Sequence, residues 1–178
     1  RLMEDHPELK YSCSQALQLK WMKDLYPAVW KGIQKRYKEG RFIPVGGAWV
    51  EPDCNVPSGE SLVRQFLFGQ RFFRKEFGLT CREFWQPDVF GYAAALPQIM
   101  RLAGMEHFFT GKLWGNQFNK PVNTTFQWQG IDGSQVLTHL PATGGSMMHP
   151  EAIFNTVNHY REHDRGHEIL MPFGIGDA

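Results

Sequence analysis

The sequence is poor in cysteine and contains no close cysteine pair. Its three cysteines, Cys13, Cys54 and Cys81, are far apart and odd in number. A disulfide framework and a zinc-finger-type site both require paired cysteines, so the pattern argues against both. It favours a protein of a reducing compartment.

Long apolar runs and a charge excess are also missing. No apolar run approaches the roughly 20 residues of a membrane span, so we expect no membrane partner. Lys and Arg number 19 against 18 Asp and Glu, a net charge of +1, and we expect no nucleic-acid partner. The basic run from Lys31 to Arg41 fits the solvated face of a helix better than a phosphate track.

Aromatic residues, by contrast, are plentiful. They make up 14% of the 178 residues and include six Trp, within a total apolar content of 42%. The length suits one ordinary domain with its own core, and extra Trp fits either that core or a site that stacks ligands. Because the chain stops directly after an apolar run, we expect a fragment of a larger protein.

Apolar periodicity, caps and breakers predict alternating strands and helices. We expect strands at 9–13, 42–50, 81–86, 107–113 and 168–173, helices at 15–23, 27–39, 58–77, 93–102 and 150–163, and a hairpin of 124–129 with 135–140 around an Asp-Gly turn. Four-residue spacing predicts one buried stripe of Trp21, Leu25, Val29, Ile33 and Tyr37.

This alternation requires an α/β fold with a parallel sheet and helical crossovers, either doubly wound or a barrel. No GxGxxG follows the first strand, so a dinucleotide-binding fold has no support.

The segment Phe84-Trp85-Gln86-Pro87-Asp88-Val89-Phe90-Gly91-Tyr92 places one acid, ringed by aromatics, between a strand and a helix. Asp88 could be a helix cap. It could equally be a catalytic carboxylate at the mouth of a barrel, where aromatic faces suit the C–H faces of a sugar.

Other strand ends carry similar groups. At or just beyond the ends of the expected strands lie Trp49, Glu51, Asp53, Lys112, Trp114 and Asp177. In a parallel barrel these ends converge. Glycoside hydrolysis requires two carboxylates, for which Asp88 and Asp177 are candidates from different strands, with Glu51 and Asp53 as competitors.

Three histidines, His159, His163 and His167, follow one another near the end of the last expected helix. Their spacing permits a metal site. However, Tyr160 replaces the Glu of a HExxH protease, and histidines near a helix C-terminus already interact favourably with its dipole, so we favour a structural role.

Several longer motifs together carry a family resemblance. The segments are 45–51 (VGGAWVE), 57–65 (PSGESLVRQ), 85–92 (WQPDVFGY), 112–114 (KLW), 126–133 (FQWQGIDG) and 173–177 (FGIGD). In this order they resemble the α-mannosidases of glycoside hydrolase family 38, most closely the cytosolic and vacuolar branch.

The resemblance implies a retaining, zinc-dependent enzyme with a seven-stranded parallel β/α barrel, of which residues 1–178 form part and into which the hairpin is inserted. The nucleophile, also a metal ligand, falls on Asp88. The acid/base residue falls on Asp177, although Ala178 stands where the family has glycine. Lys112, Trp49 and Trp114 are expected to contact the sugar.

By the same resemblance, most zinc ligands lie outside this chain, in a His-x-Asp pair upstream and a His downstream. The expected partners are a mannose-containing oligosaccharide, the rest of the polypeptide and a second copy in a homo-oligomer, in the cytoplasm or vacuole. Two alternatives stay open: another metal-dependent carbohydrate hydrolase such as a deacetylase, and a non-catalytic carbohydrate-binding protein.

Overall fold

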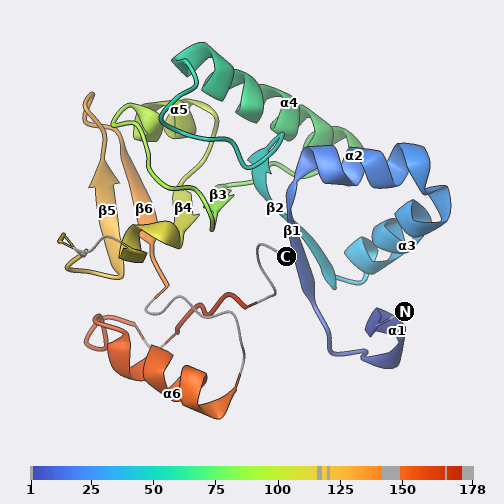
Figure 1. Ribbon diagram of the computed structural model, residues 1–178. Coiled ribbons are helices and arrows are strands. Elements are labelled where there is room, and N and C mark those ends of the chain that lie inside the picture. Colours follow the sequence, from blue (N-terminus) through green and yellow to red (C-terminus); the bar gives the residue numbers. More distant parts are fainter. Residues whose placement is uncertain (1, 116–117, 120, 142–148, 167, 174–178) are drawn as a thin grey trace.

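The chain folds into alternating helices and strands, and the computed structural model describes residues 2–115, 118–119, 121–141, 149–166 and 168–173 (Figure 1). In chain order the elements are α1 (Leu2–Asp5), β1 (Tyr11–Gln15), α2 (Ala16–Leu25), α3 (Pro27–Lys38), β2 (Phe42–Ala48), α4 (Gly59–Phe77), β3 (Glu83–Gln86), α5 (Leu96–Leu102), β4 (His107–Thr110), the 3-10 helix η1 (Lys112–Gly115), β5 (Thr125–Gln129), β6 (Gln135–His139) and α6 (Pro150–His159).

The strands form a parallel pair and a mixed four-stranded sheet. β1 pairs with β2, and the second sheet has the order β3-β4-β6-β5. β2 also lies against β3, so the two sheets follow one another. All pairings are parallel except β5 with β6. The α/β class is confirmed, whereas the described strands do not close, and the seven-stranded barrel stays a prediction.

The predicted hairpin is present, but it is not separate from the parallel sheet. β5 and β6 pair antiparallel from Thr125↔His139 to Gln129↔Gln135. β6 then pairs with β4 in parallel, so it is the next sheet strand and β5 is the edge. The strand expected at 168–173 is wrong. These residues form no strand because no described strand pairs with them, and Phe173 is 64% exposed.

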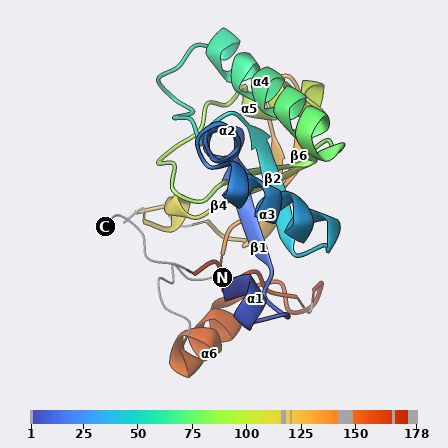
Figure 2. The same cartoon turned by 90° about the vertical axis from the view of Figure 1, so that its right-hand side faces the viewer.

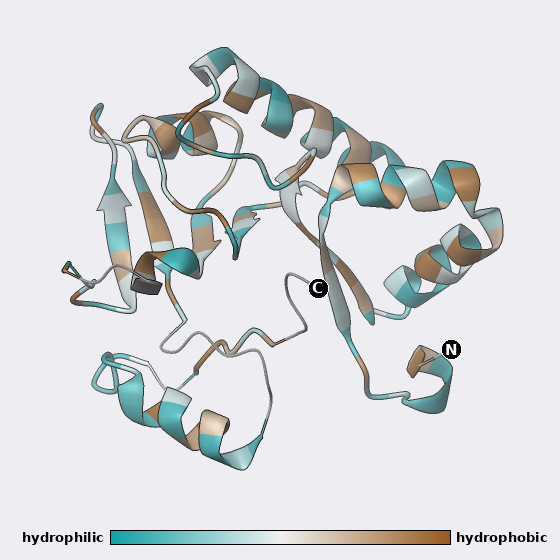
Figure 3. Ribbon diagram, viewed as in Figure 1, coloured by the Kyte–Doolittle hydropathy of each residue, from teal (hydrophilic) through white to brown (hydrophobic). Residues whose placement is uncertain are grey.

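The predicted stripe on α2 and α3 is also wrong at its N-terminal half. Trp21, Leu25 and Val29 are 50%, 65% and 50% exposed. The break at Tyr26, before Pro27, starts a new helix with a new axis, so four-residue spacing across it does not keep one face. α2 instead buries Ala16 and Leu19, and α3 buries Trp30. Figure 3 shows apolar residues on both helices.

Helix α4 agrees with its sequence signals. The Ser58 hydroxyl accepts a hydrogen bond from the Ser61 amide, and Gly78 ends the helix in the left-handed conformation. Leu62, Phe66, Phe73 and Phe77 of this helix are all buried. The Phe66 ring packs edge-on against Phe84 of β3 at 4.7 Å, which places α4 over the sheet.

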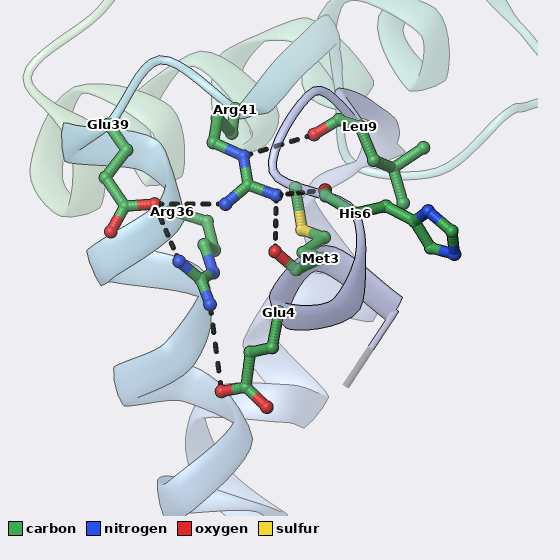
Figure 4. A network of polar contacts seen from close by, with 7 residues as sticks. All are labelled: Met3, Glu4, His6, Leu9, Arg36, Glu39 and Arg41. Atoms are coloured by element: carbon green, nitrogen blue, oxygen red, sulfur yellow. Dashed lines mark hydrogen bonds and ion pairs between the residues drawn. The ribbon is translucent and has the colours of Figure 1, made fainter.

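Two arginines of the basic run attach the N-terminal segment to α3 (Figure 4). Arg41 donates to the carbonyl oxygens of Met3, His6 and Leu9. Arg36 pairs with Glu39 at 2.8 Å and with Glu4 at 3.7 Å. These contacts give this part of the run a structural role.

The helices are unevenly distributed. Figures 1 and 2 show α2, α3, α4 and α5 gathered near the strands, with α6 set apart below them.

Among the described residues, none of the helices combines the length and hydropathy that a membrane crossing requires. The cysteines are buried free thiols, and burial raises the pKa of Cys54 and Cys81 to about 12.

Candidate active site

Asp88 lies in a turn directly after β3. Helix α5 begins only at Leu96, with Ala95 as its N-cap, so Asp88 does not cap a helix. Its carboxylate oxygen Oδ1 is 2.7 Å from the Lys112 Nζ at the start of η1, and the two side chains are 53% and 34% exposed. The Lys112 ammonium also lies 5.1 Å from the centre of the Phe90 ring. A carboxylate thus stands at the end of β3 with a cationic side chain beside it.

A second carboxylate, Glu51, follows β2. It is half-buried, and its Oε1 accepts a 2.7 Å hydrogen bond from the Ser14 hydroxyl of β1. Burial raises the pKa of Glu51, the Ser14 hydrogen bond opposes this rise, and the negative charge of Asp88 adds to it. The structure therefore brings Glu51 into the electrostatic range of Asp88.

The loops that carry these acids are joined to each other. Cys54 and Tyr92 form an isolated parallel bridge, and the Ala93 amide donates to the Cys54 carbonyl at 3.0 Å. The Tyr92 hydroxyl lies 3.0 Å from the Val89 carbonyl and also contacts the Thr110 hydroxyl. Burial is the main reason that the pKa of Tyr92 is raised. This tyrosine fixes the Asp88 turn to the end of β4.

Below these loops, aromatic side chains line one face of the sheet. Trp85, Phe109 and His139 are in register across β3, β4 and β6. The ring centres of Trp85 and Phe109 are 4.2 Å apart, and those of Phe109 and His139 are 6.2 Å apart. Since strand side chains alternate, this row lies opposite to Phe84, which contacts α4. The face that carries this row includes Trp85 of β3, the strand that Asp88 follows.

His139 and Gln86 are two further polar side chains near these strand ends that the sequence did not single out. His139 Nδ1 contacts the Thr125 hydroxyl at 2.9 Å, and burial lowers the pKa of His139. The Gln86 amide is fully buried and has no hydrogen-bond partner among the described residues. His139 falls in none of the motifs, and Gln86 lies in the 85–92 motif without a role assigned to it, because only the folded chain shows which face of a strand is covered.

The other predicted site residues have varied surroundings. Asp53 is exposed and accepts backbone hydrogen bonds from Asn55 and Val56, both 2.8 Å, which lower its pKa and give it a turn-forming role. Trp49 packs edge-on against Phe68 and Phe72 of α4. Trp114 belongs to η1, with its side chain outside what the structure describes, and Asp177 lies outside the described residues.

Metal ligands do not gather in the described part of the chain: no group of three or more His, Cys, Asp or Glu side chains there could hold an ion. His159 Nδ1 contacts the Asn155 carbonyl at 2.7 Å, and His163 packs edge-on against Tyr160. These contacts fit the structural role expected for the two histidines, while His167 lies outside the described residues.

Comparison with known proteins identifies the family. The profile of the glycosyl hydrolases family 38 N-terminal domain matches residues 1–178. The chain belongs to glycosyl hydrolase family 38. It is 49% identical over 180 residues to alpha-mannosidase 2C1 of Homo sapiens and 45% identical over 182 residues to an alpha-mannosidase of Saccharomyces cerevisiae. These alignments cover 100% and 99% of this chain but 17% of each relative.

Solved structures show the same fold in this part of the family 38 chain. An alpha-mannosidase from Enterococcus faecalis V583 superimposes with a TM-score of 0.70 at 23% identity, covering 88% of this chain and 18% of that one. A 4-alpha-glucanotransferase from Thermococcus litoralis superimposes with a TM-score of 0.62 at 17% identity, covering 78% of this chain and 22% of that one. At these identities the likeness concerns the fold alone.

Proposed function

We propose that this family 38 chain is part of a retaining α-mannosidase that removes terminal α-linked mannose from N-glycan-derived oligosaccharides. The observation that carries the proposal is the position of Asp88 in a family 38 domain: a carboxylate at a strand end, beside a cation and above aromatic side chains. The names of the relatives at 45–49% identity support the same activity.

In this proposal Asp88 is the nucleophile. Its carboxylate attacks the anomeric carbon of mannose and forms a glycosyl ester while the bond to the leaving oxygen breaks. Asp177 donates a proton to that oxygen and then deprotonates the water that hydrolyses the ester, releasing mannose with its configuration retained. Retention calls for a separation of about 5–5.5 Å between the two carboxyl groups.

The residues around Asp88 orient the reactants. The Lys112 ammonium balances and orients the Asp88 carboxylate through their 2.7 Å contact. We further propose that Lys112 binds a sugar hydroxyl and that Trp49 and Trp114 stack on sugar rings, since aromatic faces suit the C–H surface of a sugar.

We also propose a bound divalent ion, zinc, with Asp88 as one ligand. Its exposed oxygens are suitable donors, but the described residues do not form a complete site, so the other ligands must come from elsewhere in the protein. When bound, such an ion orients the hydroxyls of the sugar.

At larger scale we propose that the described strands are part of a seven-stranded barrel completed by the rest of the polypeptide. We propose that the intact enzyme is a homo-oligomer of the cytoplasm or vacuole. The unpaired thiols of Cys13, Cys54 and Cys81 support a reducing environment.

Replacing the nucleophile tests the function. In the full-length protein, Asp88→Asn should lower kcat/KM on an aryl α-mannoside by about a thousandfold or more, because the covalent step is lost. Proton NMR of the first product formed by the parent enzyme should show α-mannose. Undiminished turnover by the variant, or release of acetate from an acetylated sugar with no mannosidase activity, would contradict the proposal.

A further inference from the structure

The Ser14–Glu51 pair points to a second substrate-binding group. We infer that Glu51, held in place by Ser14, accepts a hydrogen bond from a hydroxyl of the mannosyl unit positioned at Asp88. This inference rests on the proposed function and adds to it a residue that binds the sugar without taking part in bond cleavage.

The first support is the face of the sheet on which the pair lies. Cys13 belongs to the buried core, and Ser14, the next residue of β1, therefore points to the opposite face. Gly46 of β2, with a φ of +85°, passes so close that a Cβ there would lie 2.7 Å from the Ser14 carbonyl oxygen. The hydrogen bond from Ser14 thus fixes the Glu51 carboxylate on the face opposite to the helices.

The second support is the proximity of this face to Asp88. The bridge between Cys54 and Tyr92 holds the loop after β2 against the loop after β3. Gly91 fits so closely beside Asn55 that a Cβ would lie 2.4 Å from the Asn55 amide nitrogen. Two joined loops therefore present Glu51 and Asp88 at neighbouring strand ends, next to the face that carries Trp85 and Phe109.

The third support is the chemistry of the partners of Glu51. A carboxylate with a purely structural role is usually satisfied by backbone amides or a cation, as Asp53 is by two amides. Within the described part of the chain, the hydrogen-bond donor to Glu51 is one neutral hydroxyl, on Oε1. A half-buried ionised carboxylate accepts several hydrogen bonds, and sugar hydroxyls are donors of the matching kind.

The test pairs changes in Glu51 with changes in the substrate. Full-length parent, Glu51→Ala, Glu51→Gln and Ser14→Ala proteins are assayed on an aryl α-mannoside and on its four analogues that each lack one ring or exocyclic hydroxyl. Glu60→Ala is the matched control, since Glu60 is exposed on α4 and pairs with Arg64. Thermal unfolding of each variant monitors folding.

We expect Glu51→Ala to lower kcat/KM on the complete mannoside by about 10- to 100-fold, as for a hydrogen bond to a charged group. Glu51→Gln should lose less, because its carbonyl still accepts, and Ser14→Ala should lose least. For one deoxy analogue, parent and Glu51→Ala should have equal kcat/KM, since the bond is already absent. Glu60→Ala should match the parent throughout.

Equal losses on the complete mannoside and on every deoxy analogue would overturn the inference, because Glu51 would then act only on structure or charge. Full activity of Glu51→Ala would overturn it as well. A parent protein without activity on any α-mannoside would instead contradict the proposed function, so the two failures are distinguishable.

Discussion

The Asp88–Lys112 ion pair should contribute little to folding. Both side chains are substantially exposed, at 53% and 34%, and pairs of this kind contribute about 0–1 kcal/mol to the free energy of unfolding. Its significance lies in orientation: it fixes a carboxylate at the end of β3 and concentrates opposite charges where a polar substrate could bind.

Glu51, in contrast, should reduce stability. Its pKa is raised mainly by burial, so the folded protein holds the proton more tightly than the unfolded chain does. Ionisation therefore lowers the free energy of unfolding as the pH rises from the unfolded pKa through the folded one, and this loss is complete above both values. Full-length Glu51→Gln should unfold at a higher temperature than the parent at about pH 8, with the difference shrinking towards about pH 4. A variant that melts lower than the parent at pH 8 would contradict this.

At this scale the sequence predicted some of the site residues and missed others. Asp88 and Lys112 were both selected because they lie at strand ends, and the structure brings them together. Ser14 was missed because a serine in a short, mixed strand carries no signal until its partner is known. The competitor Asp53 is exposed and bound to its own turn, whereas Glu51 is half-buried and bound to Ser14, a difference that sequence patterns did not show.

Among the elements, the close approach of α4 to β2 determines where the loop carrying Glu51 begins. A Cβ at Gly69 would lie 2.3 Å from the Gly47 carbonyl oxygen and 2.4 Å from the Ala48 carbonyl carbon. These are backbone atoms, which cannot move aside as a flexible side chain can. The helix therefore needs glycine at this position despite its poor helix propensity.

Gly69→Ala should lower the free energy of unfolding by roughly 1–3 kcal/mol, the usual range for overpacking, although alanine favours the helix. Gly32→Ala in α3 is the control: nothing lies within 4 Å of its added Cβ, so propensity alone should stabilise by up to about 1 kcal/mol. Thermal unfolding of the two full-length variants measures both effects. Equal shifts would show that α4 is not in tight contact with β2.

Element prediction succeeded where the local signals were strong and failed where long-range pairing decides. The caps that bound α4 and the Asp-Gly turn of the hairpin act within a few residues, and the predicted helix 58–77 and the predicted hairpin are both present. Whether residues 168–173 form a strand depends on a neighbouring strand, and none pairs with them among the described residues. The stripe across α2 and α3 failed because a proline changed the helix axis.

At the scale of the whole molecule, the chain spans about a sixth of the length of the relatives it matches, 17% in each case. Its described surface includes exposed large apolar side chains, among them Trp21, Leu25 and Val29. Both outermost strands, β1 and β5, have one neighbour each in the described sheets. Open edges and apolar patches of this kind promote association.

Expressed alone, the 178-residue chain should be inactive and prone to aggregation, whereas a full-length protein should be soluble and active. Light scattering and binding of a hydrophobic dye measure the first property, and turnover of an aryl α-mannoside measures the second. Mannosidase turnover by the isolated chain would contradict this expectation. The family itself could be predicted from the ordered motifs of the sequence, but closure of a barrel depends on strands beyond those that the described residues form.

Covalent labelling of the nucleophile is the most direct test of the account. A fluorinated, activated mannosyl donor, which slows hydrolysis of the glycosyl ester, would be incubated with the full-length enzyme before trypsin digestion. Cleavage after Arg82 and Arg101 yields a peptide of residues 83–101, whose only carboxylate side chains are Glu83 and Asp88. We expect one mannosyl adduct on this peptide, located at Asp88 by fragmentation. An adduct on a different acid, from an enzyme that turns over α-mannosides, would contradict the assignment.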